Sequence, residues 1–168
     1  MAEPRALERL QPSLLDRLTD DDPTSRVEAP EVRILSKARL RAAVLRDLGA
    51  LMNATRLQAS EDLSDWPEVE KSVLNFGLPA FSGATASSID VDELERALRE
   101  AILRFEPRIL ADTLKVEAIA QDSVMAWHNV VSCRISGQIW AQPVPLDMLL
   151  RTEVDLETGQ VSLAELTR

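Results

Sequence analysis

Residues 90–109 read DVDELERALREAILRFEPRI, and this stretch decides the fold. Asp90 and Glu93 form the capping-box pattern that marks the start of a helix. Apolar residues then recur with a 3.6-residue period, which is typical of a helix that buries one face: Leu94, Ala97, Leu98, Ala101, Ile102 and Phe105. Pro107 disfavours a helical backbone at the residue before it. The stretch therefore predicts an amphipathic helix that ends at Glu106.

Beyond this helix the apolar period changes from 3.6 residues to two. Three segments alternate apolar and polar side chains: 113–120 (TLKVEAIA), 131–139 (VSCRISGQI) and 148–156 (MLLRTEVDL). Such alternation is typical of half-buried strands. The sequence ETGQ then predicts a turn into a last short strand that contains Val161 and Leu163. We expect an antiparallel meander of three to four strands at the C-terminus.

Helices are predicted in the first half of the chain. In residues 36–52, five apolar residues fall on one face: Leu40, Val44, Leu48, Leu51 and Met52. A second, short helix is expected in DWPEVEKSVLNFGLP (residues 65–79), where Val69, Val73 and Phe76 share a side and Gly77 ends the helix. The sequence SGATASS at 82–88 predicts a loop. Helices followed by a meander make an α+β domain.

The N-terminal part of the chain has a different character. Ser13 can cap a short helix, SLLDRL, in which Leu14, Leu15 and Leu18 form a small apolar stripe. The charged, proline-containing stretch 19–31 has the composition of a flexible linker. We therefore divide the chain into residues 1–35, a short helix with its linker, and residues 36–168, one domain. The helix is expected to dock either on this domain or on a partner.

Charge and composition exclude several classes of protein. The chain has 19 basic and 28 acidic side chains, a net charge of −9, and the acidic excess lies beyond residue 60. This balance argues against nucleic acid as a partner. The N-terminus has no stretch that resembles a signal peptide, and no apolar run approaches the roughly 20 residues of a membrane helix. We expect a cytoplasmic protein without direct membrane insertion.

Few residues offer catalytic or metal-binding chemistry. One histidine, His128, and one cysteine, Cys133, cannot build a zinc site of the usual composition. The chain also has no glycine-rich phosphate loop. We predict a structural or surface role for His128, a core position for Cys133, and neither cofactor nor metal. The chain has three tryptophans, Trp66, Trp127 and Trp140. Two of them, Trp127 and Trp140, flank predicted strands, where we expect core packing, with an interface role as the alternative.

The sequence FEPRI raises the question whether Glu106 is a catalytic carboxylate. A general acid needs a raised pKa, whereas a neighbouring guanidinium favours the ionised form. Arg108 is two residues away, so a contact between the two side chains would oppose an acid role. We favour a pair that fixes geometry or recognises a partner. The arginines of the 36–52 helix, Arg39 and Arg46, are read as a solvated face rather than a binding surface.

Several motifs occur in one order along the chain. They are SLLDRL near the start, DLGALMNATR (residues 47–56), PEVEKSVLNFGLP (residues 67–79), SG (residues 82–83) and ILRFEPRI (residues 102–109). Together they resemble the TssE family, baseplate subunits of bacterial type VI secretion systems. That family is similar to the baseplate wedge protein of contractile-tailed phages and is often labelled lysozyme-like.

The resemblance implies a structural, non-enzymatic subunit of a cytoplasmic baseplate. It implies that the subunit links the wedge to the contractile sheath and initiates sheath polymerisation. Its expected partners are wedge subunits of the TssF, TssG and TssK types and the sheath proteins. The docking motif of the family falls on Glu106, Pro107 and Arg108. An exposed strand edge of the meander is expected to pair with a strand of the sheath.

Two other functions stay open from the sequence. The lysozyme-like label and the many carboxylates allow a peptidoglycan hydrolase, although that activity needs a route to the cell wall. An unrelated cytoplasmic adaptor, whose N-terminal helix docks on a helical partner, is the other alternative.

Overall fold

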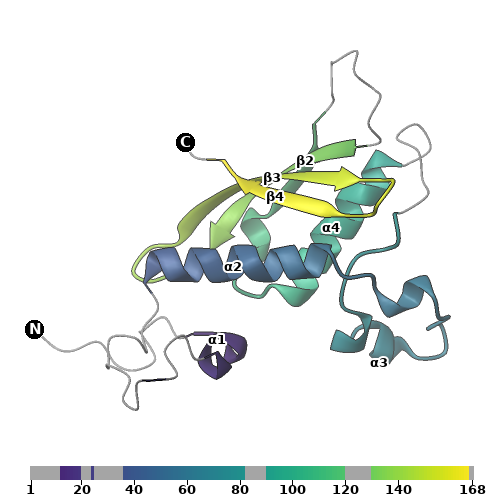
Figure 1. Ribbon diagram of the computed structural model, residues 1–168, viewed down its shortest axis with the longest axis horizontal. Coiled ribbons are helices and arrows are strands. Elements are labelled where there is room, and N and C mark those ends of the chain that lie inside the picture. Colours follow the sequence, from purple (N-terminus) through teal and green to yellow (C-terminus); the bar gives the residue numbers. More distant parts are fainter. Residues whose placement is uncertain (1–11, 20–23, 25–35, 82–89, 120–129, 167–168) are drawn as a thin grey trace, which may run out of the picture.

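The computed structural model describes residues 12–19, 24, 36–81, 90–119 and 130–166. Within these residues helices come first and a sheet comes last, so the prediction of an α+β fold is confirmed (Figure 1). The two long helices are α2 (Lys37–Met52) and α4 (Val91–Phe105). Shorter helical elements lie before, between and after them.

The sheet is an antiparallel meander of four strands in the order β1-β2-β3-β4. The strands are β1 (Lys115–Ala118), β2 (Val130–Ile139), β3 (Leu146–Asp155) and β4 (Val161–Glu165). β1 begins two residues later than the predicted segment, because the short 3-10 helix η5 (Ala111–Thr113) occupies the start of that segment. The pairing of Ile135 with Leu150 sets a register that turns the apolar side chains of β2 and β3 to the same face.

Helices α2 and α4 supply the other half of the core. The hydroxyl of Ser36 accepts a hydrogen bond from the first turn of α2, and the Asp90 carboxylate does so for α4. α2 contacts α4 and β4, while α4 contacts β1. One cluster of buried side chains joins both helices to the sheet, with Val44, Leu48, Leu94, Leu98, Ile102, Cys133, Ile135, Leu150 and Val154 at its centre. The predicted apolar faces of both helices and of β2 and β3 are therefore the core.

The prediction of one helix in residues 65–79 is wrong. This segment contains a single helical turn, α3 (Pro67–Glu70), and then the 3-10 helix η4 (Val73–Asn75). Ser72 interrupts the helix, because its hydroxyl donates to the carbonyl of Val69 and accepts from the N–H of Leu74. As a result Val73 points into solvent and does not share a buried side with its neighbours; 77% of its surface is exposed.

Gly77 ends this segment in the way the sequence predicts. Its φ is +121°, a backbone conformation that glycine adopts readily and that is strained for a residue with a Cβ atom. A Cβ atom at this position would lie 2.3 Å from the carbonyl oxygen of Ala54. Glycine therefore permits the close approach of residues 54 and 77 that returns the chain to the domain.

The two tryptophans that the structure describes are exposed, and for Trp140 this differs from the expectation of core packing. Trp66 is 64% exposed and Trp140 is 45% exposed. Trp127 lies outside the described residues, as do His128 and the predicted loop at 82–88.

The predicted N-terminal helix is present as α1 (Leu14–Leu18). Ser13 and Asp16 form a reciprocal capping box at its start. Most of the predicted linker lies outside the described residues, so the division at residue 35 stays a prediction. Among the helices that the structure describes, none has the length and apolar character needed to cross a membrane.

Candidate functional site

The predicted docking motif forms the corner between α4 and the sheet. Glu106 is the C-terminal cap of α4, and its N–H still donates to the carbonyl of Ile102. Its backbone (φ −122°, ψ 75°) has already left the helical region, as expected for a residue that precedes proline. Beyond the corner, the carbonyl of Arg108 accepts a hydrogen bond from the N–H of Trp140, just past the end of β2. The motif thus joins the helix to the sheet directly.

Glu106 and Arg108 bind each other. Nε of Arg108 donates to Oε1 of Glu106 at 2.6 Å, and Nη2 donates to Oε2 at 2.5 Å. The backbone N–H of Arg108 also donates to Oε1, at 3.2 Å. This is the bidentate arrangement in which a planar guanidinium matches a carboxylate.

Burial makes this pair more than a surface contact. The Glu106 side chain is only 4% exposed, and that of Arg108 is 22% exposed. The carboxylate of Glu106 is turned into the protein, whereas part of the Arg108 side chain stays at the surface. A buried carboxylate requires a partner, because removing an ion from water without compensation is unfavourable by several kcal/mol.

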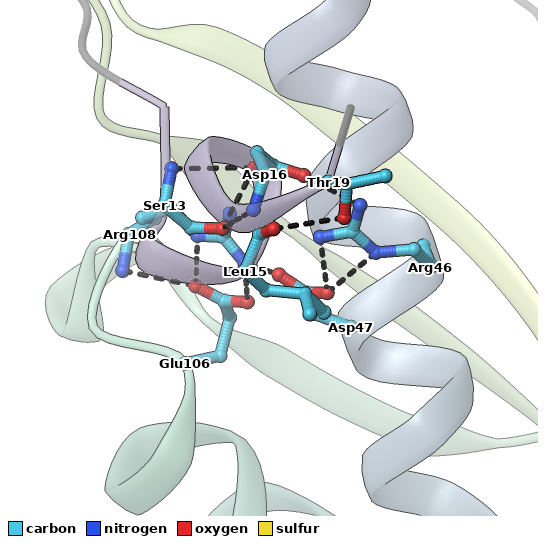
Figure 2. A network of polar contacts seen from close by, with 8 residues as sticks. All are labelled: Ser13, Leu15, Asp16, Thr19, Arg46, Asp47, Glu106 and Arg108. Carbon is cyan, nitrogen blue, oxygen red and sulfur yellow. Dashed lines mark hydrogen bonds and ion pairs between the residues drawn. The ribbon is translucent and has the colours of Figure 1, made fainter. Parts of the chain in front are cut away.

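The ion pair continues through three more charged side chains (Figure 2). Nη2 of Arg108 donates to Oδ2 of Asp47 at 2.6 Å. Asp47 in turn accepts from Arg46 at 2.9 Å, and Nη1 of Arg46 reaches Oδ1 of Asp16 at 2.5 Å. Negative and positive groups therefore alternate from the corner, across α2, to the capping box of α1. We call these five residues, Glu106, Arg108, Asp47, Arg46 and Asp16, the charge chain.

The electrostatic effects follow from these contacts. The hydrogen bond to Glu106 raises the pKa of Arg108 against the opposing effect of burial, and Asp47 adds to the rise. The hydrogen bond to Asp16, followed by that to Asp47, raises the pKa of Arg46. Burial alone would raise the pKa of Asp16, but hydrogen bonds from Arg46 and Ser13 outweigh it and lower that pKa. Each of these shifts favours the charged form that the contacts require.

The N-terminal helix α1 is attached to the domain through the charge chain. α1 lies on its own domain, and the ion pair between Asp16 and Arg46 is the charged contact that holds it there. No residue of α1 is buried, and its leucines, Leu14, Leu15 and Leu18, face solvent. Because a partly exposed ion pair contributes about 0–1 kcal/mol, the attachment of α1 is weak.

Two arginines of α2 bind other parts of the chain at the surface of the protein. Arg46 belongs to the charge chain, and Arg41 binds the carboxylate of Glu165 and the carbonyl of Asp147. Arg39 and Arg46 are both exposed, as expected of a solvated face, although Arg46 also forms ion pairs within the chain. Sequence reasoning missed Asp47 as a site residue, since nothing in the sequence of α2 indicates that this carboxylate meets Arg108.

The remaining candidates show no catalytic arrangement in the described part of the chain. Cys133 is buried in the core as predicted, and burial, assisted by the charge of Glu95, raises the pKa of its thiol to about 11. Among described residues, no three metal-ligating side chains gather in one place. Both oxygens of Glu106 accept hydrogen bonds from a guanidinium, an arrangement suited to holding the corner rather than to donating a proton.

The chain matches a protein-family model. The model described as "Baseplate wedge protein gp25" matches residues 38–144. The matched range includes all of α2 except its first residue, together with α4, the corner and β2. It therefore contains four members of the charge chain, but not Asp16. Neither the curated proteins nor the solved structures gave a match.

Proposed function

We propose a function that proceeds from one fact: the chain belongs to the family of the baseplate wedge protein gp25, which includes the TssE subunits. The family resemblance read from the sequence is thereby confirmed. Family membership supports a structural role in a phage-like baseplate, and it replaces the reading as an unrelated adaptor.

We propose more specifically a baseplate subunit of a type VI secretion system, which assembles in the cytoplasm. In this proposal it joins wedge subunits of the TssF, TssG and TssK types to the contractile sheath and initiates sheath polymerisation. The order of sequence motifs from SLLDRL to ILRFEPRI supports the TssE type.

The observation that supports the wedge contact is the set of hydrogen bonds that fixes the corner. Glu106 and Arg108 lock each other and are further tied to Asp47. Pro107, between them, is exposed and has a fixed φ. We propose that Pro107 and the exposed part of Arg108 contact a wedge subunit, while Glu106 holds them in position. A preorganised surface of this kind binds without losing further conformational freedom.

The wedge contact is tested by the substitution Pro107→Asp, which changes the exposed surface and leaves the buried pair in place. Ala80→Asp, at another exposed position, is the matched control. Both variants should fold, as judged by circular dichroism and thermal melting. Co-purification with tagged wedge subunits should fall for Pro107→Asp only. If both variants co-purify like the parent protein, the corner is not the wedge contact.

For the sheath contact we propose the outer edge of β4. The N–H of residue 166 donates to the carbonyl of Leu149 in β3. Because residues of an antiparallel strand alternate between bonding the neighbouring strand and facing away from it, the backbone N–H and C=O groups of Leu163 and Glu165 point away from the sheet. In the described residues those outward groups have no hydrogen-bond partner. The same edge is closed at Val161, whose N–H and C=O both bind the side chain of Asn53. An added strand would therefore start beyond Asn53.

The other edge of the sheet is less suited to a partner strand. The N–H of Ala118, which points outward from β1, donates to the carboxylate of Glu95 at 2.6 Å. Residues 108–110 continue this side of β2 through the bridge between Ile109 and Ile139. A side chain or a neighbouring segment therefore already occupies much of this edge.

A peptidoglycan hydrolase is not supported by any arrangement in the described residues. It remains directly testable: purified protein would degrade cell-wall substrate above a buffer control, and Glu106→Gln would abolish that activity. We expect no degradation by either protein.

A further inference from the structure

A separate feature of the molecule is the loop of residues 56–78, which we call the 56–78 loop. Its ends lie side by side, since the N–H of Arg56 donates to the carbonyl of Leu78 and the N–H of Leu78 donates to the carbonyl of Ala54. Thr55 and Leu78 form an isolated bridge. The loop extends beyond the C-terminal end of α2, away from the sheet (Figure 1).

Hydrogen bonds, most of them made by one buried side chain, hold the interior of the 56–78 loop. Asn75 is buried; its side-chain oxygen accepts from the N–H of Gln58 at 3.0 Å, and its amide nitrogen donates to the carbonyl of Glu70 at 3.0 Å. Arg104 of α4 donates to the same carbonyl at 3.2 Å. Leu63 is buried as well. The loop is therefore a fixed part of the domain.

This fixed scaffold presents three large apolar side chains to solvent. Trp66, Val73 and Leu74 are 64%, 77% and 66% exposed. Single exposed apolar residues are common on protein surfaces. Three within nine residues, on a loop that is otherwise secured by buried polar groups, instead resemble the anchors of a protein interface, where tryptophan is enriched.

The charge around these side chains indicates what they bind. Residues 56–78 contain two basic groups, Arg56 and Lys71, and five acidic groups, Glu61, Asp62, Asp65, Glu68 and Glu70, for a net charge of −3. Glu61, Asp62, Asp65 and Glu68 are exposed and form no ion pair with the described residues. Their charges are available to a partner.

We propose that the 56–78 loop is a docking surface for a basic amphipathic helix of another protein. Trp66, Val73 and Leu74 contact the apolar face of that helix, and the exposed carboxylates pair with lysines or arginines beside it. Apolar contacts supply most of the affinity, while complementary charge supplies orientation and rate of association. The inference does not depend on the role of Glu106, Pro107 and Arg108.

The same charges disfavour other occupants. A second copy of this chain would bring two acidic loops together, and like charges across an interface oppose association. An anionic membrane surface is repelled for the same reason. A basic partner is thus the class that the loop fits.

The test uses the full chain and synthetic helical peptides of about 18 residues, or five turns. The probe carries leucine on one face and lysine on the other. One control peptide replaces lysine by glutamate, and another replaces leucine by serine. Binding is measured by calorimetry and mapped by chemical-shift changes of the backbone amides. We expect the leucine–lysine peptide to bind most tightly, with shifts concentrated in residues 56–78.

Variants of the loop make the test specific. The double substitution Val73→Ser and Leu74→Ser should weaken binding about tenfold or more, because exposed anchor side chains are lost without touching the core. Val144→Ser, at a site that is 61% exposed elsewhere, is the matched control and should bind like the parent chain. Equal binding of the serine–lysine peptide, shifts outside the loop, an unaffected double variant, or self-association of the chain through this loop would each overturn the proposal.

Discussion

Replacing Arg108 by methionine should leave a charged carboxylate buried without its partner. The substitution removes both side-chain hydrogen bonds to Glu106 and the one to Asp47, and the Glu106 side chain is only 4% exposed in the parent protein. Removal of one member of a buried ion pair lowers the free energy of unfolding by about 3–5 kcal/mol. Domains are stable by about 5–15 kcal/mol, so a large share of the stability is lost. Each kcal/mol corresponds to roughly 2–4 °C in Tm at this chain length.

The measurement is urea unfolding followed by circular dichroism, with an unchanged slope as evidence that only stability has changed. Arg151→Met is the matched control, because it breaks an ion pair with Glu153 in which both side chains are 46% exposed. That pair contributes about 0–1 kcal/mol. The double variant Glu106→Met, Arg108→Met should recover most of the loss, since no charge is then left without its partner. Equal losses for Arg108→Met and Arg151→Met would refute the reasoning.

Three further predictions concern other parts of the molecule. Gly77→Ala should destabilise the domain by about 1–3 kcal/mol or more, because residue 77 has a positive φ and the new Cβ would lie 2.3 Å from a carbonyl oxygen. Gly49→Ala, on α2 where a Cβ has open space, should instead stabilise the domain by up to about 1 kcal/mol. The melting temperatures of the two variants should therefore move in opposite directions. Leu163→Pro removes an outward N–H from β4 without removing a hydrogen bond to β3. It should therefore impair sheath assembly in cells more than Leu163→Ala does. Equal effects of the two substitutions would argue against the outer edge of β4 as the sheath contact. Because the pKa of Asp16 is lowered in the folded protein, the stability from its contact with Arg46 is fully present above the pKa that Asp16 has in the unfolded chain, and it is lost as the pH falls through the pKa of Asp16 in the folded chain. In an NMR titration, Arg46→Gln should raise the pKa of Asp16 in the folded protein. An unchanged pKa of Asp16 would mean that the ion pair does not form in solution.

The sequence predicts much of the fold because the decisive signals are local. The apolar period of α4 and the proline after Glu106 place the helix and its end. Alternation places β2 and β3, in which every second side chain faces the core. Each of these signals depends on residues that are close together in the chain. The apolar faces that they predict are also the faces that the folded protein buries, so packing stabilises the predicted elements.

The prediction of one helix in residues 65–79 is wrong for a physical reason that is also local. Val69, Val73 and Phe76 have helical spacing, which predicts one buried side. The hydroxyl of Ser72 bonds the backbone on both sides of it and divides the helix after α3. The spacing of apolar residues does not take into account a polar side chain between them that forms hydrogen bonds with the backbone in place of the helix.

The charge chain lies beyond such reasoning because its members are distant in sequence. Arg108 and Asp47 are 61 residues apart, and Arg46 and Asp16 are 30 apart. The pair of Glu106 and Arg108 is foreseeable from its spacing of two, but its burial is not. Burial arises only when α2 packs beside the corner and brings Asp47 to Arg108.

Burial also changes what the corner contributes to recognition. A fully exposed Glu106 would offer its charge to a partner, whereas the buried carboxylate is already satisfied by Arg108. In our proposal the partner therefore meets Pro107 and the remaining exposed surface of Arg108, held in a shape that Glu106 and Asp47 determine. A conservative change to lysine at Arg108 keeps the charge but loses the bidentate geometry. It should therefore disturb the shape of the corner, and with it wedge binding, more than its unchanged charge suggests.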